Sequence, residues 1–112
     1  IEINQENLNA VSEGMRSVAE DGGTAYSVFK DFDVSVGGKT GSAEAGKYVN
    51  AWFTGFAPFE DPEISIVVMV ENGGHGNYTA EVVREIMSEY FGMNVANVTE
   101  DMSAKLETES FR

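Results

Sequence analysis

The chain of 112 residues contains no cysteine, only 2 prolines and few basic residues. The absence of cysteine excludes a disulfide framework, a thiolate metal site and a cysteine nucleophile. Because 7 Lys and Arg stand against 19 Asp and Glu, the net charge of -12 argues against a nucleic-acid partner or an anionic membrane surface. The longest apolar run, Ile66 to Val70, is far shorter than the roughly 20 residues of a membrane-spanning helix.

The residues that are present predict a folded unit of modest size. The sequence is 42% hydrophobic and 11% aromatic, which supports a core but not a large one. The first residue is isoleucine and no basic-then-apolar leader follows it, so we treat the chain as a candidate piece of a longer protein. We expect a folded part over residues 1–92 and a polar, acidic C-terminal extension over residues 93–112.

Two segments have the apolar periodicity of amphipathic helices. The first ends at the glycines 22–23, and its apolar residues recur every three or four positions: Leu8, Val11, Met15 and Val18. The second has a wide apolar face made of Val82, Val83, Ile86, Met87, Tyr90 and Phe91. For this second helix we expect Thr79 as the N-terminal cap, Glu81 in the first turn and Gly92 as the C-terminal cap.

Three strand candidates lie between the helices, at residues 33–42, 48–57 and 64–71. Because short connections with turn residues separate them, we expect an antiparallel meander and, with the helices, an α+β fold. Residues 64–71 are apolar on both faces, which indicates a central strand covered on each side, yet the chain offers no further strand to flank it. We therefore expect this chain to complete a larger domain.

The stretch "VSVGGKTGSAE", residues 34–44, carries the side chains with the clearest chemistry. On a strand, Lys39 and Gly41 share one face, while Thr40 and Ser42 share the other. One face therefore offers a cation beside open space, and the other offers two hydroxyls. If this strand lies at the edge of the sheet, a peptide-like ligand can bind to it as an added strand. A Lys-Thr-Gly triplet alone is a weak signal.

The neighbours of the triplet make the signal more specific. In chain order the sequence reads "GTA" at residues 23–25, "GGKTGSAE" at 37–44, "AWFTGFAPF" from 51, "ISIVVMVENGG" from 64, and a helix that ends in "YFG". This series resembles the C-terminal part of the transpeptidase domain of class B, or monofunctional, penicillin-binding proteins, over roughly residues 5–92. The resemblance implies a β-lactamase/D,D-peptidase-like transpeptidase fold. In that fold the three strands would belong to a five-stranded antiparallel sheet, with the triplet strand at the edge beside the active-site cleft.

The resemblance also implies a D,D-transpeptidase that cross-links peptidoglycan stem peptides through a serine acyl-enzyme and that β-lactams acylate. In such an enzyme Lys39 would supply positive potential in the cleft and form a hydrogen bond to the serine of a second motif, Ser-x-Asn. Thr40 and Ser42 would bind the terminal carboxylate of the substrate or antibiotic, and Gly41 would keep the strand open to it. The backbone N–H of Ser42 would form half of the oxyanion hole.

Two further residues are expected close to these substrate contacts. Trp52 follows the triplet on the next strand and would support the cleft. Glu44 would place a carboxylate near an anionic ligand and weaken β-lactam binding. No cofactor and no metal is expected, because the lone histidine, His75, sits in a glycine-rich loop without further ligands at metal-binding spacing.

The remaining catalytic parts are expected elsewhere. We place the Ser-x-x-Lys motif that carries the nucleophile, and the Ser-x-Asn motif, in an upstream part of the same protein. This chain alone is therefore expected to be inactive. The family's other partners would be stem peptides and β-lactams, and its location the extracytoplasmic face of the bacterial cytoplasmic membrane, through an N-terminal anchor outside this chain.

Two alternatives use the same Lys-Thr-Gly triplet. One is a D,D-carboxypeptidase or β-lactamase-type hydrolase, which passes the acyl group to water. The other is a penicillin-sensing domain that is acylated without turnover. The stretches "AWFTGFAP" and "VVMVENGG" favour the transpeptidase.

Overall fold

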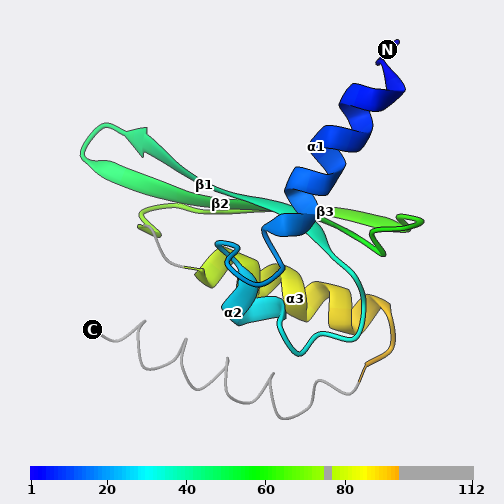
Figure 1. Cartoon of the computed structure of the whole chain (residues 1–112). Coiled ribbons are helices and arrows are strands. Elements are labelled where there is room, and N and C mark those ends of the chain that lie inside the picture. Colours follow the sequence, from blue (N-terminus) through cyan, green and yellow to red (C-terminus); the bar gives the residue numbers. More distant parts are fainter. Residues whose placement is uncertain (75–76, 94–112) are drawn as a thin grey trace.

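A computed structural model describes residues 1–74 and 77–93 of the chain. Its elements are α1 (Gln5–Ser17), α2 (Tyr26–Phe29), β1 (Gly37–Ala45), β2 (Tyr48–Ala57), β3 (Ile64–Val70) and α3 (Tyr78–Tyr90). The strands form an antiparallel sheet in the order β1-β2-β3, with α2 and α3 below it and α1 rising above it in the view of Figure 1. The predicted α+β meander is confirmed. The predictions for His75 and for the extension fall outside the described residues, apart from Met93.

Helix α1 begins where the side chain of Asn4 accepts hydrogen bonds from the backbone N–H groups of Glu6, at 2.8 Å, and Asn7. The helix packs against β1 but buries none of its own residues completely. Its predicted apolar stripe is therefore only partly used, and Leu8 and Val11 remain exposed. This face of α1 is left open to solvent.

Helix α3 ends as its sequence predicts but begins differently. After the helix, the N–H of Gly92 bonds the carbonyl of Glu89 and the N–H of Met93 bonds that of Ser88, which is the Schellman pattern that a glycine in the left-handed region permits. The expectation that Thr79 caps the helix is wrong. The helix already starts at Tyr78, so Thr79 lies inside its first turn and is buried.

The first strand is also displaced from its predicted position. It covers residues 37–45 instead of 33–42, because β2 ends at Ala57 and its register with β1 begins with the pair Gly37 and Phe56. Val36, which the alternation assigned to the strand, instead packs into the core from the preceding loop. The single-turn helix α2 was not predicted, and β3 ends at Val70, one residue early.

The core lies between the sheet and helices α2 and α3, and Phe53 is its centre. Phe53, Val83 and Met87 are its largest fully buried side chains. The ring of Phe53 occupies the space beside the two glycines that face each other across β1 and β2, Gly38 and Gly55. A Cβ atom at Gly38 would lie only 2.5 Å from Cζ of Phe53, so the ring and the glycine fit each other closely.

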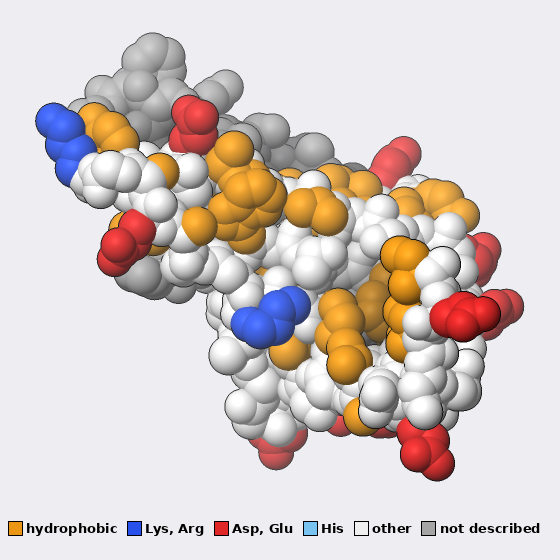
Figure 2. Space-filling view, turned by 90° about the horizontal axis from the view of Figure 1, so that it is seen from above, with side chains coloured by type: hydrophobic (Ala, Val, Ile, Leu, Met, Phe, Trp, Pro, Cys, Tyr) orange, Lys and Arg blue, Asp and Glu red, His pale blue; other side chains and the backbone are white. Residues whose placement is uncertain are grey.

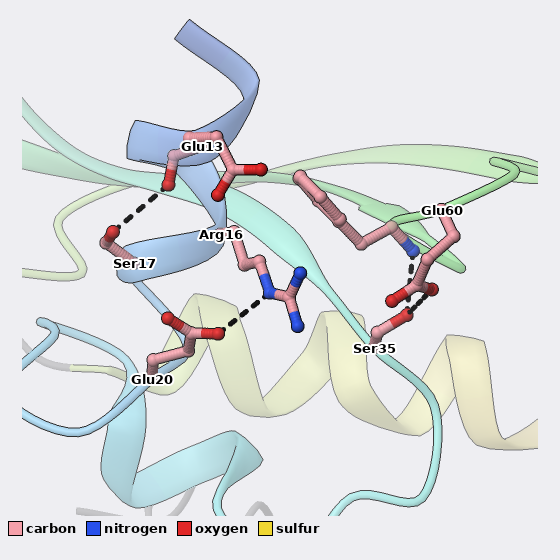
Figure 3. Close-up of polar contacts among 7 residues, drawn as sticks. Glu13, Arg16, Ser17, Glu20, Ser35 and Glu60 are labelled. Carbon is pink, nitrogen blue, oxygen red and sulfur yellow. Dashed lines mark hydrogen bonds and ion pairs between the residues drawn. The ribbon is translucent and has the colours of Figure 1, made fainter. Parts of the chain in front are cut away.

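A polar cluster holds the loop before β1 in place (Figure 3). The N–H of Phe59 donates to the backbone carbonyl of Ser35 at 3.0 Å and to its hydroxyl at 2.9 Å, and that hydroxyl donates to the carboxylate of Glu60. Next to it the Arg16 guanidinium lies 4.9 Å from the centre of the Phe59 ring and pairs with Glu20, three residues after the end of α1. These contacts join α1, the loop before β1 and the turn after β2.

The first prediction concerns the fit of Phe53 against Gly38. We expect Gly38→Ala to lower the free energy of unfolding by about 1–3 kcal/mol, because the surrounding core prevents the ring from moving away. Gly37→Ala is the matched control: its Cβ would lie 2.4 Å from Cζ of Phe56, but that ring is half-buried and can turn. Thermal unfolding of the protein should show the larger fall in Tm for Gly38→Ala. Equal falls would contradict the packing argument.

The second prediction concerns pH. The hydrogen bond from Ser35, with one from the backbone of Glu60 itself, lowers the pKa of the Glu60 carboxyl below its usual value of 4.5. A lowered pKa stabilises the fold above the unfolded-state pKa, and this contribution disappears as the pH falls through the folded-state pKa. The Tm difference between the protein and Ser35→Ala should therefore be larger at about pH 7 than at about pH 3. A difference that stays constant with pH would refute the linkage.

Candidate active site

Strand β1 places residues 39–42 at an outer edge of the sheet. Thr40 lies opposite Phe53, and residues that pair across two strands share a face. Thr40 and Ser42 therefore lie on the face of the buried core, while Lys39 and Gly41 lie on the other face. The predicted division into a cation on one face and two hydroxyls on the other is confirmed.

A cavity of about 600 Å³ opens at this edge. Its lining combines the four residues of the Lys-Thr-Gly-Ser stretch with one residue from each of three other segments: Lys39, Thr40, Gly41, Ser42, Thr24, Trp52 and Asn77. Because residues from both faces of β1 take part, the cavity follows the strand edge. A ligand there can reach both the cation of Lys39 and the hydroxyls of Thr40 and Ser42.

Among the described residues that line the cavity, Lys39 is the one that carries a charge. Its Nζ donates a hydrogen bond of 2.7 Å to the backbone carbonyl of Thr40. Among residues 1–74 and 77–93, no carboxylate lies within ion-pair distance of Lys39; the ion pair found there joins Arg16 and Glu20. The positive charge is thus available to an anionic ligand.

The structure separates the two residues that were expected near the substrate contacts. Trp52 lines the cavity and its side chain remains 40% exposed there. Glu44 does not line the cavity; it lies further along β1 toward the hairpin turn and is exposed. An effect of Glu44 on ligand binding stays a prediction.

Two lining residues were missed at the sequence level. Thr24 belongs to the "GTA" motif, which carried the resemblance but had no role assigned to it, and its Oγ1 lies 3.4 Å from Oγ1 of Thr40. Asn77 directly precedes α3, and its Nδ2 donates to Oγ of Ser27 at 3.4 Å instead of capping that helix. The motif was a usable signal for Thr24, whereas no sequence pattern marked Asn77.

The sequence also contains one Ser-x-x-Lys spacing that the expectation about the nucleophile overlooked, Ser27 to Lys30. Ser27 lies in the single turn of α2 and Lys30 follows directly after it. Both residues are exposed and neither lines the cavity beside Lys39. The spacing is therefore present in the chain without the placement that a catalytic pair in this cavity requires.

The fold and the cavity define a class of protein. An antiparallel sheet with helices on its core face is the fold that this chain shares with solved penicillin-binding transpeptidase domains. The solved structure of Pseudomonas aeruginosa PBP2 superimposes with a TM-score of 0.72 and 35% sequence identity, covering 80% of this chain and 21% of that one. The predicted fold class is confirmed, while the completion to five strands stays a prediction.

The family model described as penicillin binding protein transpeptidase domain matches residues 1–88, so the chain belongs to this family. The chain is 31% identical to the peptidoglycan D,D-transpeptidase MrdA of Haemophilus influenzae, over 80% of its own length. It is 40% identical to the probable peptidoglycan D,D-transpeptidase PenA of Neisseria flavescens, over 70% of its length. The predicted relationship to class B penicillin-binding proteins is confirmed.

The chain spans only a small part of these relatives. It covers 16% of the length of the Haemophilus protein and 22% of the Neisseria protein. Within the described ranges, no helix is long and apolar enough to cross a membrane.

Proposed function

We propose that this chain supplies one wall of the active site of a peptidoglycan D,D-transpeptidase. The enzyme would cross-link stem peptides through a serine acyl-enzyme, and β-lactams would acylate the same serine. The observation that carries the proposal is the cavity at the edge of β1, whose lining contains the whole Lys-Thr-Gly-Ser stretch and a lysine that no described carboxylate neutralises.

Each residue of the stretch has a role that fits its place. Lys39 provides positive potential and a hydrogen bond to the serine of the Ser-x-Asn motif. The hydroxyls of Thr40 and Ser42, which share a face, bind the carboxylate of the substrate's terminal D-alanine or of the antibiotic. Gly41 leaves the strand open for a ligand to approach, and the N–H of Ser42 stabilises the oxyanion.

The chemical step requires a nucleophile that this wall does not contain. The serine hydroxyl loses its proton as its oxygen bonds to the carbonyl carbon of the substrate amide or β-lactam, the C–N bond breaks, and the nitrogen takes up a proton in exchange. In the transpeptidase an amine of a second stem peptide then displaces the serine. We place the serine, with its Ser-x-x-Lys motif, and the Ser-x-Asn motif in the upstream part of the same protein.

The exposed apolar surface supports a larger domain. On β3 the side chain of Val67 is 63% exposed and that of Met69 is also open, and on α1 Val11 is 61% exposed. Figure 2, which views the molecule from above, shows hydrophobic side chains reaching the surface over this face. We propose that two upstream strands pair beside β3 and that upstream helices cover these side chains, which completes a five-stranded sheet.

The same proposal includes the cellular location. A transpeptidase acts where peptidoglycan is assembled, so we propose the extracytoplasmic face of the bacterial cytoplasmic membrane. The anchor would be an N-terminal segment outside this chain.

The third prediction tests where the nucleophile lies. A fluorescent penicillin should label the full-length protein but not the isolated chain of residues 1–112. A dye that binds apolar surface should show the opposite pattern, because the isolated chain leaves the face of Val67 and Val11 uncovered.

The control for this experiment is Ser27→Ala, which removes the serine of the chain's own Ser-x-x-Lys spacing. This variant should leave labelling of the full-length protein unchanged. Labelling of the isolated chain that disappears in Ser27→Ala would overturn the placement of the nucleophile upstream.

The fourth prediction tests the role of Lys39. In the full-length protein, Lys39→Ala should slow acylation by penicillin at least about a hundredfold, because the developing charge loses a preorganised electrostatic partner. The Tm should change little, since the side chain is exposed. Lys47→Ala is the matched control: Lys47 is an exposed lysine in the turn between β1 and β2, outside the cavity lining. Equal acylation rates in the two variants would remove Lys39 from the site.

A further inference from the structure

Thr24 and Thr40 are brought together only by the fold. They are 16 residues apart in sequence, Thr24 in the loop between α1 and α2 and Thr40 on β1, yet their hydroxyl oxygens lie 3.4 Å apart. Both residues line the cavity beside Lys39. The hydroxyl of Thr24 is therefore next to the group to which the proposed function assigns the substrate carboxylate.

The loop holds Thr24 firmly in this place. The next residue, Ala25, is completely buried, and its N–H donates to the carbonyl of Val18 at 2.9 Å. The preceding residue, Gly23, passes so close to the end of α1 that a Cβ atom there would lie 2.1 Å from the carbonyl oxygen of Ser17. Thr24 is thus fixed on both sides by backbone contacts, which a surface loop usually lacks.

The chemistry of the two hydroxyls decides which of them donates in the hydrogen bond between Thr24 and Thr40. A carboxylate only accepts hydrogen bonds, so Thr40 must use its single O–H donor on the ligand and has lone pairs left to accept from a neighbour. Thr24 is the neighbour that can donate to it. Lys39 already donates to the backbone carbonyl of Thr40, so this carbonyl has a donor of its own.

We propose that Thr24 is a positioning residue that donates to Oγ1 of Thr40 and aims the Thr40 hydroxyl at the carboxylate of the substrate or β-lactam. The inference rests on the proposed function. A separation of 3.4 Å is long for an O–H···O bond, whose usual length is about 2.7–2.8 Å, so the contact by itself contributes little. A bound carboxylate accepts a hydrogen bond from the Thr40 hydroxyl, which polarises its oxygen, and excludes water, and both effects strengthen the bond from Thr24.

The fifth prediction compares two ligands in the full-length protein. Thr24→Val keeps the shape of the side chain and removes its hydroxyl, whereas Thr24→Ser keeps the hydroxyl. Thr24→Val should lower the second-order acylation rate of a penicillin with a free carboxylate by about three- to tenfold, the range expected for one neutral hydrogen bond. Thr24→Ser should restore the rate, and the methyl ester of the same penicillin should react within about twofold in all three proteins.

A double variant tests whether the two hydroxyls act as one unit. If Thr24 works through Thr40, then Thr24→Val should cost nothing further in a Thr40→Val background. If Thr24→Val lowered the acylation rate equally for the free-carboxylate penicillin and for its methyl ester, the role of Thr24 would be purely structural and the proposal would be overturned. An unchanged rate in Thr24→Val, or full additivity with Thr40→Val, would also overturn the proposal when the Tm shows that the variants are folded.

The outcomes also separate this inference from the proposed function. If Thr40→Val slows acylation by the penicillin with a free carboxylate but Thr24→Val does not, only the role of Thr24 fails. The proposed function and the inference fail together in two cases. In one, Thr40→Val leaves the acylation rate of the free-carboxylate penicillin unchanged; in the other, the full-length protein is not acylated at all.

Discussion

The register between β1 and β2 is the constraint on which the rest of the structure depends. The buried ring of Phe53 fits beside Gly38 and Gly55, where a Cβ atom would come within 2.5 Å and 3.0 Å of ring atoms. A slip of one residue in one direction would bring Lys39 to the position of Gly38, where a Cβ atom clashes with the ring of Phe53. A slip of one residue in either direction would exchange the faces of Lys39 and Thr40. The packing that builds the core therefore also decides on which side of the edge strand the cation and the hydroxyls lie.

The cavity beside that strand is assembled from separate segments, and hydrogen bonds anchor two of the loops that position them. The loop with Thr24 is tied to the end of α1 through the bond from Ala25 to Val18. The loop that leads into β1 is tied to the turn after β2 through Ser35 and Phe59. Most of these anchors are backbone hydrogen bonds, which hold a loop in place without large apolar burial. The wall of the cavity is thus positioned by contacts that lie outside the cavity itself.

The sequence predicts those parts of this fold that depend on local periodicity. The two long helices, the three-stranded meander and the alternation along the triplet follow from it directly. The start of β1 was misplaced because Val34 and Val36 alternate as a strand does, although no strand in the described part of the chain pairs with them. Thr79 was assigned as a cap because capping statistics cannot show that the helix starts at the residue before it. Thr24 and Asn77 join the cavity through tertiary contacts between distant segments, which no local pattern encodes.

The net charge of -12 and a cavity suited to an anion are compatible, because electrostatic potential is local. Salt screens exposed charges beyond about 8 Å, so the acidic surface as a whole has little effect inside the cavity, where Lys39 is the charged lining residue. Glu44 is separated from Lys39 by five positions, which at about 3.4 Å per residue is roughly twice that screening length. It is only two positions from Ser42 on the same face, about 7 Å, so under the proposed function its repulsion would act on a carboxylate bound by Ser42. Under the proposed function, the electrostatic balance at this site would therefore be set by Lys39 and Glu44 on one strand and not by the composition of the chain.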